Sequence, residues 1–300
     1  MNISDLKAFV CVAEQHSFSH AAERLHLTQP AISKRVAALE NSLGTRLFDR
    51  IGRSVKLTTA GSALLTHAQK ILLAVEDSRR AIHNLSGEVS GQLSIGTSHH
   101  TGLHRLPTVL KAFSQEFTEV QLDLHFLDSE AACASVEHGD FELAVVTLPP
   151  FDDSPLTMIP VWQDPLVLVT AHDHPLCALK QITPAQLTHY AAILPSHGTF
   201  TRDLIDHHFK DHRHSLNVRL ETNYLETIKM LVSIGQGWSV LPETLVDESL
   251  RAHAGYFAAN RILGVVHHPK RTLSNAAQAF IKCCGAAQLA IQNSPPKPPE

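Results

Sequence analysis

The sequence predicts an α/β protein in three parts: a small helical head, one long helix and a larger α/β body. Apolar residues recur at helical spacing through residues 4–39, and a long helical repeat follows from residue 59. From Gln92 the pattern changes to alternating strands and helices, which is typical of a parallel sheet. The chain has 300 residues, which is enough for more than one folding unit.

The head is predicted to contain three helices and a short hairpin. Residues 4–14 form the first helix, and Ser17 caps the second. Thr28 caps the third helix, where Pro30 suits the first turn because no N–H is needed there. Residues 51–57 then predict a hairpin with a glycine turn. This order indicates a winged helix-turn-helix.

The long helix is predicted over residues 59–88 and carries a heptad repeat. Its seam consists of Leu64, Ala68, Ile71, Val75, Ser78, Ile82 and Leu85. Such a seam packs either on its own domain or on a second copy of the helix. The length of the seam favours a partner helix, because a long exposed apolar stripe is costly to solvate.

The body begins with a β-α-β-α-β pattern, which implies parallel strands with right-handed crossovers. The expected elements are strands at 92–96, 120–126 and 141–146, with helices at 104–117 and 129–138. A second set starts with a strand at 166–170 and continues with a helix at 224–234, a turn into a strand at 235–242 and a closing helix at 273–291. The proline-rich tail, residues 293–300, is expected to be disordered.

Charge and cysteine usage narrow the class of protein. Residues 1–60 carry a net charge of +3, and the remainder of the chain carries −7. We therefore expect the basic head, and not the acidic body, to bind a polyanion. Five cysteines without a Cys-x-x-Cys pair indicate reduced thiols. No apolar run approaches the roughly 18 residues of a membrane span, and the N-terminus lacks a signal pattern, so we expect a cytoplasmic protein.

Enzyme signatures are lacking in the sequence. It has no Gly-x-Ser-x-Gly elbow and no Walker motif. Gly235 and Gly237 lack the third glycine of a dinucleotide loop. We therefore expect neither catalysis nor a cofactor.

Several motifs resemble those of LysR-type transcriptional regulators. Residues 21–33, with the sequence AAERLHLTQPAIS, are similar to the DNA-binding signature of that family. Further matches at the correct offsets are Leu39-Glu40, Gly44, Leu47-Phe48-Asp49-Arg50 and Leu57-Thr58-Thr59-Ala60-Gly61. Gly235, Gly237, Leu241 and Pro242 are similar to the late glycine-rich turn of the family's effector domain. The resemblance covers nearly the whole chain except the tail.

The resemblance implies a winged helix-turn-helix over residues 1–58, a linker and dimerisation helix over 59–88, and an effector domain over 91–292 similar to type 2 periplasmic binding proteins. The implied lobes are residues 91–161 with 267–292, and residues 162–266. The implied partners are a double-stranded DNA operator, a small-molecule effector and further copies of the chain in a homodimer or homotetramer, with RNA polymerase as another candidate. A solute-binding protein, the alternative of a different class, would share the two lobes but needs export and no DNA-binding head.

The candidate DNA-binding residues surround the start of the third helix and the wing. They are Thr28, Gln29, Pro30, Ser33, Lys34, Arg35 and Arg53. A glutamine can donate to and accept from an adenine edge, whereas lysine and arginine suit phosphate or guanine. The alternative is that these are ordinary solvated positions on a helix.

The resemblance also places an effector between the lobes, held by residues 97–101 and 196–201. The candidates are Ser98, His100, Thr101, Thr147, Thr199 and Thr201. Hydroxyl donors beside a helix N-terminus favour an anion or a small carboxylate. The alternative is that the hydroxyls only cap helices.

Two other regulatory chemistries remain open. Histidine clusters near His100, His172 and His208 suggest a metal-responsive regulator, although no His-Glu-x-x-His motif accompanies them. A redox sensor is the other alternative, and the resemblance implies that it would use a cysteine pair in the second lobe, as the peroxide-sensing branch of the family does. That lobe offers only Cys177, and Thr199 and His208 lie where a pair would be sought.

Overall fold

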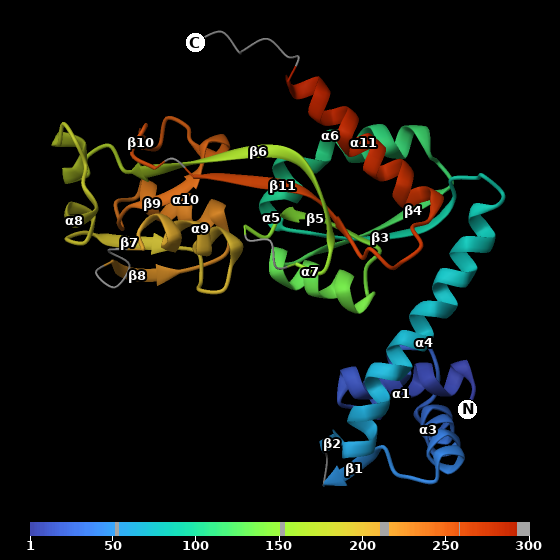
Figure 1. Ribbon diagram of the computed structural model, residues 1–300. Helices are drawn as coiled ribbons and strands as arrows, with labels where there is room; N and C mark the ends of the chain where they lie inside the picture. Colours follow the sequence, from blue (N-terminus) through green and yellow to red (C-terminus); the bar gives the residue numbers. More distant parts are fainter. Residues whose placement is uncertain (52–53, 151–153, 211–215, 258, 293–300) are drawn as a thin grey trace. The chain divides into compact units, whose positions relative to one another are not determined.

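The computed structural model describes residues 1–51, 54–150, 154–210, 216–257 and 259–292. The chain divides into two compact units, Met1–Ser86 and Gly87–Glu300 (Figure 1). Across the described ranges, no helix combines the length and the apolar character that crossing a bilayer requires.

Three helices form the head of the first unit. They are α1 (Ile3–Gln15), α2 (Phe18–Arg24) and α3 (Gln29–Leu43). Phe9, Ile32 and Leu39 are fully buried in the core between them. Ser17 caps α2 as predicted, by accepting a hydrogen bond from a backbone N–H of the first turn. Thr28 occupies the N-cap position of α3, but its side chain makes no cap hydrogen bond to any described residue, so backbone geometry starts that helix.

The predicted hairpin is present beside α3. Strand β1 (Phe48–Ile51) pairs antiparallel with β2 (Ser54–Leu57). Glu40, near the end of α3, accepts hydrogen bonds from the backbone N–H groups of Leu47 at 2.7 Å and Phe48 at 3.4 Å. This carboxylate therefore joins the hairpin to the third helix.

Helix α4 (Thr59–Asn84) begins directly after the hairpin. Thr58 caps it by accepting a hydrogen bond from the N–H of Gly61 at 3.0 Å. A Cβ at Gly61 would lie 2.1 Å from the carbonyl oxygen of Leu47. The first turn of α4 can therefore lie this close to the hairpin only because residue 61 has no side chain.

The heptad seam of α4 behaves differently along its length. Ala68 is fully buried and Leu64 packs on the core of the head. Farther along, Ile71 is 37 % exposed, Ile82 71 % and Leu85 82 %. The expectation that the whole seam faces a partner is therefore corrected, because its first part packs on its own domain while its later part is exposed in the single chain.

The second unit is built on a seven-stranded sheet with the order β10-β6-β11-β5-β3-β4, in which β9 also pairs with β6. Strands β3 (Gly91–Thr97), β4 (Val120–Phe126) and β5 (Leu143–Thr147) are parallel, which confirms the predicted β-α-β-α-β pattern. The intervening helices are α5 (His99–His104), α6 (Leu106–Glu116) and α7 (Ser129–His138). The single helix predicted at 104–117 is thus two helices, and the first begins five residues earlier.

Two long antiparallel strands run between two hydrophobic cores. They are β6 (Thr157–Thr170) and β11 (Asn260–His267). Trp162 and Leu263 belong to the core of β3–β5, whereas Leu168 belongs to the core around Trp238. These cores define two lobes. The expected return to the first lobe at residue 267 comes earlier in the structure, because β11 already contributes Leu263 to the first core.

Short elements complete the second lobe. They are a 3-10 turn at Pro175–Ala178, α8 (Pro184–Leu187), β7 (Ala191–Leu194), α9 (Phe200–His208), β8 (Asn217–Glu221), α10 (Leu225–Ser233), β9 (Ser239–Pro242), a 3-10 turn at Glu243–Leu245 and β10 (Arg251–His253). The closing helix α11 (Asn275–Gln292) returns to the first lobe and lies along α6 (Figure 1). Phe280 of α11 meets Phe113 of α6 edge to face, with ring centroids 5.1 Å apart.

Candidate functional site

The N-terminal turn of α3 presents a polar face. Gln29 and Lys34 are exposed, and Ser33 and Arg35 are half-buried. Gln29 Nε2 donates a hydrogen bond to Ser33 Oγ at 3.0 Å, so the first turn orients the glutamine amide. Thr28 and Pro30, at the same end, are exposed as well. Six predicted DNA contacts therefore lie together around one helix end; the seventh, Arg53, lies outside the described residues.

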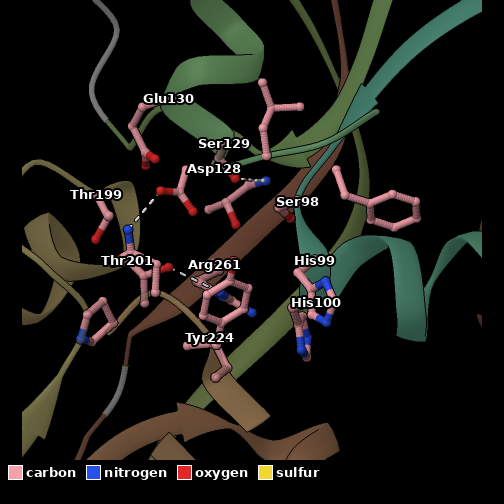
Figure 2. A pocket seen from close by; sticks show the side chains of 16 residues that line it. Ser98, His99, His100, Asp128, Ser129, Glu130, Thr199, Thr201, Tyr224 and Arg261 are labelled. Atoms are coloured by element: carbon pink, nitrogen blue, oxygen red, sulfur yellow. Dashed lines mark hydrogen bonds between the residues drawn. The ribbon is translucent and has the colours of Figure 1, made fainter. Parts of the chain in front are cut away.

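A pocket of about 120 Å³ lies where the two lobes of the second unit meet (Figure 2). The first lobe contributes Ser98 after β3 and the segment 128–130 at the start of α7. The second lobe contributes Thr199 and Thr201 at the start of α9, and strand β11 contributes Arg261. A molecule bound here would contact both lobes.

Five of the six predicted effector residues line this pocket. They are Ser98, His100, Thr147, Thr199 and Thr201. Thr101 is fully buried instead, and its hydroxyl accepts a hydrogen bond from Ser98 Oγ at 2.8 Å. The prediction for Thr101 is corrected because α5 begins at His99, so Thr101 lies in its first turn and faces its own N-cap. Its role is to position Ser98.

The sequence prediction missed the charged residues of the pocket. Arg261 is 3 % exposed and donates to Thr201 Oγ1 at 3.1 Å (Figure 2). Asp128 and Glu130 line the same pocket from the start of α7. No local pattern marked Arg261 as a pocket residue, because β11, the strand that carries it, was not itself predicted.

Arg261 belongs to a buried network of charges. Its guanidinium pairs with Asp164, which is fully buried and also accepts a hydrogen bond from Arg105 at 2.9 Å. Burial by itself would raise the pKa of Asp164, but the neighbouring His100 and Arg261 hold that pKa well below its usual range. Asp164 is therefore an ionised carboxylate that orients Arg261 in the wall of the pocket.

Two acidic residues at the start of α7, Asp128 and Glu130, join the lobes across the pocket. The carboxylate of Glu130 accepts a hydrogen bond from the backbone N–H of Phe200, and Asp128 accepts one from the Asn223 amide at 2.8 Å. Burial raises the pKa of Glu130 above its ordinary value, although the Phe200 hydrogen bond opposes this. The pocket therefore offers a cation and two carboxyl groups, and it is not a purely cationic anion site.

Comparison with known proteins identifies both units. The model of the LysR substrate binding domain matches residues 86–288, and the model of the bacterial regulatory helix-turn-helix protein, lysR family, matches residues 3–62.

Individual relatives agree with these matches. A probable RuBisCO transcriptional regulator of Synechocystis sp. is 30% identical over 291 residues, which cover 93% of this chain and 84% of the relative. An uncharacterized HTH-type transcriptional regulator of Azotobacter vinelandii is 64% identical over 107 residues, which cover 36% of this chain and 74% of the relative. Among solved structures, a full-length OxyR variant from Pseudomonas aeruginosa has the same fold, with a TM-score of 0.69 at 23% identity over 96% of this chain and 94% of that chain. The chain belongs to the LysR family of transcriptional regulators.

Proposed function

We propose that two or more copies of this regulator bind an operator through α3, and that a small effector held between the lobes changes that binding. The observation that carries the proposal is the pocket itself. It gathers hydroxyls of both lobes, Ser98 and Thr201 among them, around the buried Arg261. A ligand that contacts both lobes can favour one arrangement of them, which is the requirement for a regulatory effect.

The hydrogen-bond directions suggest which effector suits the pocket. Thr201 accepts from Arg261, so its own hydroxyl proton is available to a carboxylate beside the guanidinium. Ser98 donates to Thr101 and therefore offers an acceptor, as do Asp128 and Glu130. We propose a small hydroxy- or amino-carboxylate, whose donor group faces these acceptors. A fully deprotonated inorganic anion such as sulfate would bring a further negative charge to Asp128 and Glu130 without a donor.

A ligand screen on the full-length protein tests this proposal. We would measure thermal unfolding with a panel of small hydroxy- and amino-carboxylates and with phosphate and sulfate as inorganic controls. A ligand at a hundred times its dissociation constant stabilises the folded protein by about 2.7 kcal/mol, which is readily measured. The expected result is stabilisation by an organic acid of this class.

Calorimetry of variants then locates the ligand. Ser98→Ala and Thr201→Ala each remove one hydrogen bond to the effector, which is worth about 1–3 kcal/mol when a charged group is involved. Thr188→Ala, which removes a hydroxyl that bonds its own helix away from the pocket, is the matched control. Unchanged affinity in both pocket variants would place the effector elsewhere.

The cysteines favour a small-molecule effector over a redox signal. Cys133 and Cys284 are buried, and burial raises the pKa of each thiol to about 12. Thiols of this kind are rarely ionised at neutral pH and react slowly with oxidants. Cys177, half-buried in the second lobe, donates its S–H to the carbonyl of Ala171 and has no cysteine partner among the described residues.

A further inference from the structure

A second cluster of polar side chains lies beside the pocket and is built from both lobes. His100 and His104 lie on successive turns of α5, and Glu226 lies in the first turn of α10. One candidate ligand atom from each of the three residues lies within 4.8 Å of the other two. His104 Nε2 is 3.0 Å from Glu226 Oε1, and His100 Nδ1 is 3.8 Å from the same oxygen.

His100 is unusual because it is buried without a hydrogen bond to any described residue, although the carboxylates of Asp164 and Glu226 lie 3.6 Å and 3.8 Å from its ring nitrogens. It is 5 % exposed, and neither of its ring nitrogens has a hydrogen-bond partner among the described residues. Glu226 Oε2 is also buried and has no hydrogen-bond partner among the described residues. A buried polar atom without a partner is costly, so each such atom in a folded protein calls for an explanation. A bound ion would supply the missing partner to both residues.

The donor set and its surroundings fit a transition-metal ion. Two imidazoles and one carboxylate hold Zn²⁺ in sites that keep a fourth position open, whereas Mg²⁺ and Ca²⁺ prefer oxygen ligands only. Behind His100, Asp164 Oδ2 lies 3.6 Å from Nε2, while Nδ1 faces Glu226. A carboxylate behind a ligating histidine is a common arrangement in metal sites because it orients the ring.

We propose that His100, His104 and Glu226 form a binding site for a divalent transition-metal ion, with Zn²⁺ as the reference ion. The ion joins α5 of the first lobe to α10 of the second. It therefore stabilises one arrangement of the lobes, as the effector does. The site is independent of the proposed effector residues in one respect: His104 and Glu226 do not line the pocket, so changing them leaves the pocket wall intact.

The local charges permit this assignment. Arg105 and Arg261 are the nearby cations, and Asp164 accepts hydrogen bonds from both. The negative charges of Asp164 and Glu226 together balance the positive charges of Arg105 and Arg261. The competing arrangement without metal is an ion pair between Glu226 and a protonated His104.

Zinc titration of the metal-stripped, full-length protein distinguishes the two arrangements. A chromophoric chelator competes for the ion, so weak binding to other surface histidines is excluded. We expect one tight site per chain. Because loss of a residue behind a ligand already weakens a metal site by about 10–100-fold, His104→Ala and Glu226→Gln should each weaken zinc binding at least that much. His138→Ala, an exposed histidine at the end of α7, is the matched control and should bind as the unaltered protein.

Two further readouts complete the test. Zinc should raise the unfolding temperature of the unaltered protein and of His138→Ala, but not of His104→Ala. Cobalt, bound in place of zinc, should show the visible absorption of a nitrogen- and oxygen-ligated site, and His104→Ala should lose it. If no tight site is found, or if the unaltered protein, His104→Ala and Glu226→Gln bind zinc alike, the three residues form only an ion pair and the proposal is overturned. His104 is exposed, so its substitution leaves the fold intact. If Glu226→Gln disturbs the packing, the result for His104→Ala by itself decides the test.

Discussion

Arg261 of β11 donates a hydrogen bond to the hydroxyl of Thr201 in α9 at 3.1 Å, and so ties a strand that runs between the lobes to a helix that borders the pocket. The same guanidinium pairs with the fully buried Asp164. One buried side chain therefore orients a pocket hydroxyl and also neutralises a charge that has no access to solvent. Stability and ligand contact depend here on the same residue.

The first prediction concerns that residue. Arg261→Met leaves Asp164 with Arg105 as its remaining arginine partner, and breaking one half of a buried ion pair costs about 3–5 kcal/mol. Urea unfolding of the full chain measures the loss. Arg219→Met, on the exposed face of β8, is the control and should change stability by no more than about 0.5 kcal/mol. A similar small loss in both variants would mean that Arg261 is not needed to hold Asp164.

The second prediction concerns the close contact of α4 with the hairpin. Gly61→Ala gains helix propensity, but its Cβ would lie 2.1 Å from the carbonyl oxygen of Leu47, and that contact is with rigid backbone. Overpacking of this kind costs about 1–3 kcal/mol, which exceeds the gain in propensity. Gly285→Ala in α11 is the matched control, because a Cβ there meets nothing within 4 Å. It should stabilise the protein by up to about 1 kcal/mol. Thermal unfolding that shows both variants stabilised would contradict the close approach.

The third prediction uses the raised pKa of Glu130. Burial raises the pKa of Glu130 in the folded protein above its ordinary value near 4.5. Below pH 4.5 the protonated carboxyl makes its full contribution to the stability of the fold. That contribution is lost as the pH rises through the raised pKa of the folded state. Glu130→Gln resembles the protonated acid and keeps an acceptor for the N–H of Phe200. The variant should equal the unaltered protein in stability at pH 4 and exceed it at pH 7. Glu130→Ala, which also loses the acceptor, should be less stable than the unaltered protein at pH 4. Urea unfolding of both variants at pH 4 and at pH 7 measures these differences. If the stability difference between Glu130→Gln and the unaltered protein is the same at pH 4 and pH 7, folding does not change the pKa of this carboxyl.

Local patterns were sufficient to predict most of the fold. The periods of 3.6 and 2 correctly predicted the head and strands β3, β4 and β5, because each of these elements is marked by a regular run of apolar residues within a short stretch of the chain. The first part of β6 and the whole of β11 were missed, as were the second-lobe elements β7, α9, β8 and β10. Strand β6 contributes to both cores, and β11 pairs with β6 and β5, so the burial of these two strands depends on distant neighbours that a local window does not contain.

The candidate site was predicted only in part for a similar reason. The family resemblance pointed to the segments that carry Ser98, Thr199 and Thr201, and the structure places all three in the pocket. Arg261 became visible only through its pairing with Asp164, 97 residues away. The site of His100, His104 and Glu226 likewise needs a carboxylate 122 residues from His104, so helical spacing alone identified only the histidine pair.

The fourth prediction concerns the exposed end of α4. Ile82 and Leu85 are 71 % and 82 % exposed in the single chain, and a partner helix would cover them. Ile82→Glu combined with Leu85→Glu should therefore separate the subunits and weaken operator binding, while each chain keeps its fold. Ala81→Glu, exposed but off the seam, is the control. Sedimentation velocity at fixed concentration measures the subunit number. If the double variant sediments as the unaltered protein does, subunit association does not use this part of α4.

The fifth prediction concerns how α3 reads DNA. Gln29 Nε2 has two protons and donates one to Ser33 Oγ at 3.0 Å, which leaves the other proton and Oε1 facing outward. That pair matches the acceptor and donor on the major-groove edge of adenine. Lys34, exposed one residue beyond Ser33, suits a phosphate instead.

Gln29→Ala should therefore cost about 1–3 kcal/mol on an operator selected from random duplexes and little on a shuffled duplex of the same composition. Lys34→Ala provides the contrast, because loss of a phosphate contact should weaken binding to both duplexes equally and reduce the slope of affinity against salt by about one. Ser33→Ala should act in the same direction as Gln29→Ala but more weakly, since it frees the amide without removing it. Fluorescence anisotropy at one fixed salt concentration measures all three variants. Equal losses for Gln29→Ala on both duplexes would exclude a base contact and reduce Gln29 to a solvated helix position.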